Sequence, residues 1–578
     1  MTSLLRLVIR PVLPAAAVLA LILPAVASTT VSTHAPSGYG NYLAGQEALR
    51  NLATGDAARY FHDATAVEWG NPTVVTHAFL AYLTNGDIDH AVELANHLLE
   101  LRPDFTLAKL VVATSDLKDR RYRAVEKLLD NAPADDFAGI GANILKAWAM
   151  VGEDRRDDAF AALDKIGNSG LDDFLVFHRA LMADVTGDST DAINFAGKAY
   201  QASPTASRMV DAYARMLGNA GRFDDAIAVI DKFNAQSLGD PVIDALRKTL
   251  AAHQRPGLFS PNVQSGAAKM FHGIAVALAR DGSNDLAIGL LQLGAYLDPH
   301  DDVIPLLIGQ LLDNAAQHAA ANRYYTNIPQ TSPMRLVASV RIAQNFDAMG
   351  NRPEALRELG DIVAANPTDL DAMTVYAELL RVDKQYDQAA QIYTKAIDGQ
   401  PAGVRPGEWV LYYERGIAYE RSGKWDKAQP DFLKALNLNP DQPQVLNYLG
   451  YTWVDKGENL DQALAMIQKA VKATPTDGFI VDSLGWAFFR LGRIDDAVST
   501  LEQAVQLKPN DPQINDHLGD AYWKAGRKLE AHFQWNVAAS LDPDDTLKAA
   551  LIKKQANGLE GSATALTATP AVPTTTIQ

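Results

Sequence analysis

The stretch DSLGWAFFRLGRIDDAVSTLEQAVQLKPND, residues 482–511, encodes two amphipathic helices joined by a short turn. Large apolar residues crowd its first half. In its second half Val498, Leu501 and Val505 recur every three or four residues, which is the helical period. Gly492 permits a left-handed end to the first helix, and Pro509 ends the second. The stretch therefore predicts a helix–turn–helix hairpin.

The same pattern returns 34 residues later as DHLGDAYWKAGRKLEAHFQWNVAASLDPDD, residues 516–545. With Ala497 as a marker of the second helix, fourteen alanines fall in register along the chain, and ten of them are followed twelve residues later by a proline. The register consists of Ala57, Ala91, Ala124, Ala159, Ala192, Ala226, Ala287, Ala321, Ala355, Ala389, Ala428, Ala463, Ala497 and Ala531. So long a register predicts a serial array of hairpins.

The unit resembles the tetratricopeptide repeat, with a small residue at Gly485, a large aromatic residue at Phe488, alanines at Ala497 and Ala504, and Pro509 at the end. The resemblance is closest over residues 389–543, and the first four hairpins lack most of the aromatic residues. It implies an all-α fold, a solenoid in which about fourteen hairpins form a right-handed superhelix in two arrays.

The spacing of the register predicts the domain boundaries. Between Ala226 and Ala287 the step is 61 residues, which is 27 more than one repeat. Within it, DPVIDALRKTLAAH has a helical pattern, and QRPGLFSPNVQSG has the composition of a loop. We therefore expect a degenerate N-terminal array at 42–235, a cap helix and joint at 236–266, a C-terminal array at 267–545, a short helix at 546–558 and a disordered Ala/Thr/Pro-rich tail at 559–578.

The N-terminus is typical of an export signal. MTSLLRLVIR supplies Arg6 and Arg10 without an acidic residue, an apolar run follows, and Ala25-Val26-Ala27 precedes Ser28. We expect a signal peptide at 1–27, a polar spacer at 28–41 and a periplasmic protein. An uncleaved anchor is the alternative, although the apolar run of about 17 residues is shorter than the roughly 20 of a spanning helix. The chain has no cysteine, so it is not a lipoprotein.

Composition and motifs argue against several functions. The net charge of −17, without any Lys/Arg-rich run, argues against nucleic-acid binding. No phosphate-binding loop, nucleophile elbow, zinc-protease motif or dinucleotide fingerprint is present. His90 and His97 are seven residues apart, which is too far for a metal pair on one helical turn. We therefore expect no enzymatic activity, no cofactor and no metal.

In the tetratricopeptide family the first helix of each hairpin lines a concave groove. The resemblance implies a partner-binding groove formed by Tyr413, Ile417, Asn447, Tyr451, Asp482, Trp486, Phe489, Arg490, Asp516, Asp520 and Trp523. Trp, Tyr and Arg dominate binding hot spots, so we expect alanine at Trp486 and Trp523 to abolish partner binding. The alternative is that these aromatic residues form core between hairpins.

The exported leader together with LNYLGYTWVDKGENLDQALAMIQKAV, residues 446–471, and DGFIVDSLGWAFFRLGRIDDAVSTLEQA, residues 477–504, is similar to bacterial cell-envelope tetratricopeptide proteins. These include adaptors of carboxyl-terminal processing proteases. The resemblance implies a non-enzymatic scaffold that binds a protein partner, with a periplasmic protease or an envelope-assembly component as candidates. Membrane attachment would come only through an uncleaved leader or a partner. The alternative is a scaffold for exopolysaccharide or envelope assembly that binds glycan directly.

Overall fold

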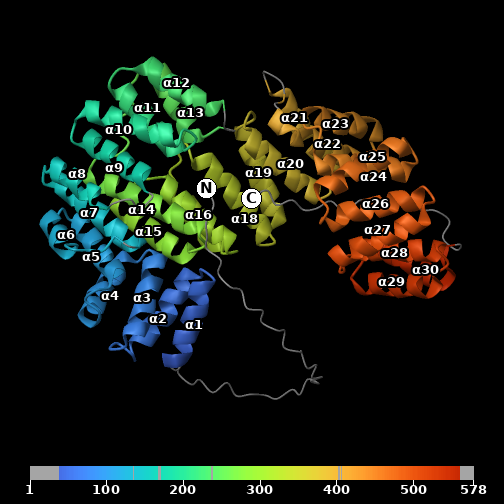
Figure 1. Ribbon diagram of the computed structural model, residues 1–578, viewed down its shortest axis with the longest axis horizontal. Coiled ribbons are helices and arrows are strands. Elements are labelled where there is room, and N and C mark those ends of the chain that lie inside the picture. Colours follow the sequence, from blue (N-terminus) through green and yellow to red (C-terminus); the bar gives the residue numbers. More distant parts are fainter. Residues whose placement is uncertain are drawn as a thin grey trace, which may run out of the picture. The chain divides into compact units, whose positions relative to one another are not determined.

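The computed structural model describes residues 38–134, 136–166, 171–235, 239–400, 404 and 406–559. In these ranges the chain forms thirty α-helices and one short 3-10 helix, without a β-strand (Figure 1). The predicted all-α fold is confirmed. The expected signal peptide, most of the spacer and nearly all of the tail lie outside the described residues. No helix in the described ranges combines the length and the apolar character needed to cross a bilayer.

The chain divides into two compact units, each made of two separate segments. Unit 1 consists of the described residues up to His178 together with Asn262–Leu297. It contains α1 (Gly38–Arg50), α2 (Thr54–Thr65), α3 (Pro72–Asn85), α4 (Ile88–Leu101), α5 (Thr106–Lys118), α6 (Tyr122–Leu128), α7 (Phe137–Gly152), α8 (Arg156–Asp164), the first half of α9 (Asp172–Val185), α14 (Val263–Arg280) and α15 (Asn284–Leu297).

Unit 2 consists of Arg179–Pro261 and the described residues from Asp298 onward. It contains the rest of α9, then α10 (Ser189–Ala202), α11 (Ser207–Asn219), α12 (Phe223–Asn234), α13 (Pro241–Ala251), α16 (Val303–Asn314), α17 (His318–Thr326), α18 (Arg335–Ala348), α19 (Arg352–Ala365), α20 (Leu370–Val382), α21 (Tyr386–Asp398), η1 (Pro406–Glu408), α22 (Val410–Arg421), α23 (Trp425–Leu438), α24 (Pro443–Lys456), α25 (Leu460–Ala473), α26 (Gly478–Arg490), α27 (Ile494–Leu507), α28 (Pro512–Lys524), α29 (Lys528–Ser540) and α30 (Asp545–Asn557).

Each hairpin turns at a residue with left-handed backbone. Nine of these residues are glycines, such as Gly492 at φ 76°, because glycine adopts positive φ without a steric cost. At the other turns the position is held by Leu52, Arg120, Asp154, Ala316 and Lys384. These turns account for the pairing of consecutive helices into hairpins.

The alanine register marks the buried face of the second helix of each hairpin. Thirteen of the fourteen alanines are completely buried. The exception is half-buried Ala124, which lies in the short helix α6 of a degenerate hairpin. The small residue of the partner helix explains the close approach, since a Cβ added at Gly485 would lie 2.5 Å from Cγ of Leu501.

The hairpin formed by α14 and α15 packs inside unit 1, against α3, α5 and α7 (Figure 1). Gln264 Nε2 donates to the carbonyl of Leu117 at 2.9 Å, and Gln292 Nε2 donates to the carbonyl of Thr84 at 3.1 Å. Gly266 lies against the ring of Trp148. The boundaries of the two units therefore differ from those of the two predicted arrays. The first hairpin of the predicted C-terminal array, α14–α15, belongs to unit 1, where it is hydrogen-bonded to helices of the predicted N-terminal array.

Candidate binding surface

The first helices of three successive hairpins, α24, α26 and α28, bring the central part of the predicted groove together. Asp477 accepts hydrogen bonds from the backbone N–H groups of Phe479 and Ile480 at the start of α26. Asp511 does the same for α28, at 2.9 Å from the nitrogens of Gln513 and Ile514. Such caps satisfy free N–H groups of the first turn and define where each helix begins. Equivalent positions of α26 and α28 therefore lie in register.

A small cavity of about 20 Å³ lies where these three helices meet. Asn447 and Tyr451 of α24, Asp482 and Ser483 of α26, and Gln513 and His517 of α28 are among its lining residues. Within the described residues, Oδ1 of Asn447 and Oη of Tyr451 are buried and have no hydrogen-bond partner. A cavity of this size holds about one water-sized group, and unpaired buried polar atoms are rare in folded proteins. We call it the Tyr451 cavity.

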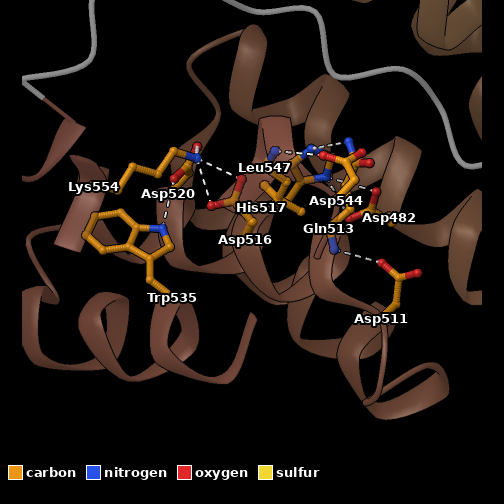
Figure 2. A network of polar contacts seen from close by, with 10 residues as sticks. All are labelled: Asp482, Asp511, Gln513, Asp516, His517, Asp520, Trp535, Asp544, Leu547 and Lys554. Carbon is orange, nitrogen blue, oxygen red and sulfur yellow. Dashed lines mark hydrogen bonds and ion pairs between the residues drawn. The ribbon is translucent and has the colours of Figure 1, made fainter. Parts of the chain in front are cut away.

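One wall of the Tyr451 cavity is an ion pair between neighbouring hairpins. Nδ1 of His517 lies 2.9 Å and 3.0 Å from the two carboxylate oxygens of Asp482 (Figure 2). The imidazole of His517 also stacks on the indole of Trp486, with ring centroids 4.2 Å apart. The indole of Trp486 also stacks on the ring of Phe489, with ring centroids 4.8 Å apart. Trp486 is 2% exposed, so it acts as packing between α26 and α28.

A second buried cluster joins α28 to the last helix. Lys554 Nζ of α30 donates to both carboxylate oxygens of Asp516 at 2.7 Å and to Asp520 at 2.8 Å (Figure 2). Nε1 of Trp535 donates to the other oxygen of Asp520 at 3.0 Å. The lysine side chain is 11% exposed, and the two carboxylates are 8% and 5% exposed. These aspartates therefore bind the chain's own last helix.

The electrostatic environment of the Tyr451 cavity is acidic. Burial raises the pKa of Tyr451 well above its usual value, and Asp482 and Asp455 raise it further against the opposing effect of Arg490. Burial alone would lower the pKa of His517, but the carboxylates of Asp482, Asp516 and Asp520 outweigh burial and raise it. Negative charge thus dominates at this point of the surface.

The other predicted groove residues lie elsewhere. Tyr413 and Ile417 are buried core residues. The ring of Tyr413 packs edge-to-face against that of Tyr448, with ring centroids 6.0 Å apart. Arg490 is bonded to Asp455 at 3.2 Å. Trp523 is half-buried, and its ring centroid lies 5.3 Å from that of Trp535 in the same hairpin. The structure thus brings together Asn447, Tyr451 and Asp482, and their role in partner binding stays a prediction.

Two important residues were not among the predicted groove residues. His517 follows Asp516 by one position, and only its contact with Asp482 on the preceding hairpin reveals its place. Lys554 lies in the short helix expected at 546–558. The 34-residue register could have found it, because Trp486, Asp520 and Lys554 are equally spaced.

A larger hollow of about 480 Å³ lies at the turn between hairpins, next to Phe479 and Lys508. Lys508 lies over the ring of Phe479 at 4.9 Å, and no unpartnered buried polar atom in the described residues belongs to this lining. The Tyr451 cavity is therefore the better candidate for a binding site. Among the residues that the structure describes, no group of three or more His, Cys, Asp or Glu side chains is placed to hold a metal ion.

Comparison with known proteins defines the class. Residues 485–526 match the family described as TPR repeat, and residues 340–404 and 409–442 match families described as tetratricopeptide repeat. The chain carries tetratricopeptide repeats and forms the solenoid fold built from them. Proteins of this kind are in general non-enzymatic scaffolds for protein–protein interaction.

Relatives share only part of the chain. A TPR repeat-containing protein, PA4667 of Pseudomonas aeruginosa, is 26% identical over 188 residues, which cover 32% of this chain and 31% of that protein. Tetratricopeptide repeat protein 13 of Homo sapiens is 27% identical over 188 residues, or 32% of this chain and 21% of that protein. The match thus spans about a third or less of each relative.

Two solved structures align over most of the chain. The APC/C hetero-tetramer Cut9–Hcn1 is 15% identical, with 90% of this chain and 96% of that chain covered and a TM-score of 0.38. Yeast Tom70 is 16% identical over the same shares, with a TM-score of 0.34. At these TM-scores the alignments establish no closer relationship.

Proposed function

We propose that this chain is an exported scaffold that binds a segment of a partner protein on the face where α24, α26 and α28 meet. The observation that carries the proposal is the Tyr451 cavity. It is lined by the carboxylate of Asp482, and the Oδ1 of Asn447 and the Oη of Tyr451 there have no hydrogen-bond partner among the residues that the structure describes. Buried polar atoms without a hydrogen bond cost free energy unless another group satisfies them. A bound segment would supply that group.

Unit 1 offers less support for a binding surface of this kind. Its helices α3, α5 and α7, the first helices of their hairpins, pack against the α14–α15 hairpin of the same chain. We therefore propose that the partner site lies on the C-terminal hairpins.

Export and the nature of the partner rest on the sequence. Arg6, Arg10 and the Ala25-Val26-Ala27 motif support cleavage after Ala27 and a periplasmic location. A mature protein beginning at Ser28 in intact-mass measurement would support export, and a full-length mass would oppose it. A periplasmic protease is one candidate partner, by resemblance. Direct glycan binding has weaker support, because the aromatic rings of Trp486 and Trp523 are already packed against protein side chains.

The proposal is tested by photo-crosslinking from defined positions. A benzoylphenylalanine replaces Gln513, which lines the Tyr451 cavity, and the control replaces Ser499, which is exposed on the second helix α27. Both proteins are irradiated in envelope extract of the native host. We expect one polypeptide to be cross-linked from position 513 and not from position 499. Identical products from both positions, or none from position 513, would contradict the proposal.

A further inference from the structure

The Tyr451 cavity presents hydrogen-bond acceptors. The carboxylate of Asp482 and the Oδ1 of Asn447 can only accept, whereas the Oη of Tyr451 can accept as well as donate. Within the described residues neither Oδ1 nor Oη has a hydrogen-bond partner. Ser483 Oγ uses its own hydrogen on the carbonyl of Phe479 at 3.0 Å, so it adds no donor to the cavity. The matching group is therefore one that donates several hydrogen bonds at once.

The charges around the cavity favour a cation. Of the nearby ionised groups, Arg490 already binds Asp455, and Lys554 binds Asp516 and Asp520. Among the described residues, Asp482 is paired with His517 alone, and the four carboxylates of Asp455, Asp482, Asp516 and Asp520 outnumber the three basic side chains Arg490, His517 and Lys554. A positive group entering here would be paired at once, which offsets the cost of removing it from water.

The size of the cavity selects among cations. About 20 Å³ accommodates one water-sized group. An ammonium group is compact and carries three donors at the end of a thin chain, whereas the planar guanidinium of arginine carries five donors over a wider area. Asn447 and Gln513 are half-buried, so the cavity borders the solvent and a side chain can enter from there.

We propose that the Tyr451 cavity is a subsite for the ammonium group of a lysine side chain in the bound segment, held by Asp482, Tyr451 and Asn447. This inference rests on the proposed function, because the lysine belongs to the partner segment. It adds the chemical preference of the site, lysine over arginine and over uncharged residues. A water molecule is the alternative occupant.

The test uses random linear peptides displayed and selected on the full chain. Selected peptides are remade with each lysine replaced by arginine or by methionine, and their dissociation constants are measured by fluorescence anisotropy. For one lysine of each peptide, either replacement is expected to weaken binding of the peptide to the wild-type chain by about tenfold or more. On Tyr451→Phe and Asp482→Asn the same replacements should change affinity by only about twofold, because the coupled partner is already gone.

The matched control is Tyr448→Phe, on the same helix, whose hydroxyl donates to Glu420 at 3.0 Å and does not line the cavity. It should keep the wild-type preference for lysine. Peptides that bind with equal affinity after lysine replacement, or that lose the same affinity on all variants, would overturn the inference and leave the scaffold proposal standing. Failure to select any peptide would contradict the scaffold proposal itself.

Discussion

Nδ1 of His517 lies 2.9 Å from a carboxylate oxygen of Asp482, thirty-five residues earlier in the chain. The contact joins the first helices of adjacent hairpins, and both side chains are almost fully buried. It links packing to charge at the edge of the proposed binding site, because a proton on His517 gives the imidazole a positive charge beside the carboxylate of Asp482.

The first prediction concerns pH. The carboxylates around His517 raise its pKa in the folded chain above the usual value, although burial opposes them. A raised pKa adds stability that is fully present below the unfolded-state pKa of about 6.5 and is lost as pH rises through the folded-state value. Replacing His517 by Gln should therefore lower the melting temperature most at about pH 5.5 and least at about pH 8.5. An effect that grows with pH would contradict this.

The second prediction concerns Lys554. Replacement by Met leaves the buried carboxylates of Asp516 and Asp520 without their cation, so the C-terminal hairpin should lose about 3–5 kcal/mol of stability. Hydrogen exchange over α28, α29 and α30 measures the loss locally. The control Lys553→Met changes an exposed neighbour and should leave exchange unchanged. Equal exchange in both variants would show that the contacts of Lys554 with Asp516 and Asp520 add no stability.

The third prediction concerns the turns. Lys384 is exposed and holds a left-handed backbone at φ 62°, so Lys384→Gly should stabilise its hairpin by about 1 kcal/mol. Gly492 has φ 76° and no atom within 4 Å of an added Cβ, so Gly492→Ala should destabilise by a similar amount through backbone strain alone. Thermal melting measures both changes: the melting temperature should rise for Lys384→Gly and fall for Gly492→Ala. Shifts in the same direction would contradict the claim that left-handed backbone at these turns favours glycine.

These turns show why the fold was predictable from sequence. Gly492 and the buried register alanines act within one hairpin, so a single repeat already contains the information. The site was less predictable, because it depends on contacts between hairpins. Trp486 has the same place in its repeat as Asp520, yet one stacks on His517 and the other binds Lys554. Repeat position alone did not reveal that both are buried.

The fourth prediction concerns the hairpin packed within unit 1. A Cβ at Gly266 would lie 2.1 Å from Cη2 of Trp148, so Gly266→Leu should force α14 away from α7. Limited proteolysis should then cut the segment 252–262 sooner. The helical glycine Gly55 meets only Asn85 Oδ1 at 3.7 Å, so Gly55→Ala is the control and should be cut like the wild type. Unchanged cleavage of Gly266→Leu would mean that the close contact does not hold the hairpin in place.

The most direct test of the scaffold account is hydrogen exchange of the full chain, free and bound to the partner segment identified by cross-linking from position 513. We predict slower exchange in the first helices Pro443–Lys456, Gly478–Arg490 and Pro512–Lys524, and little change in the second helices of the same hairpins. Slower exchange confined to the second helices, or to Unit 1, would contradict the account.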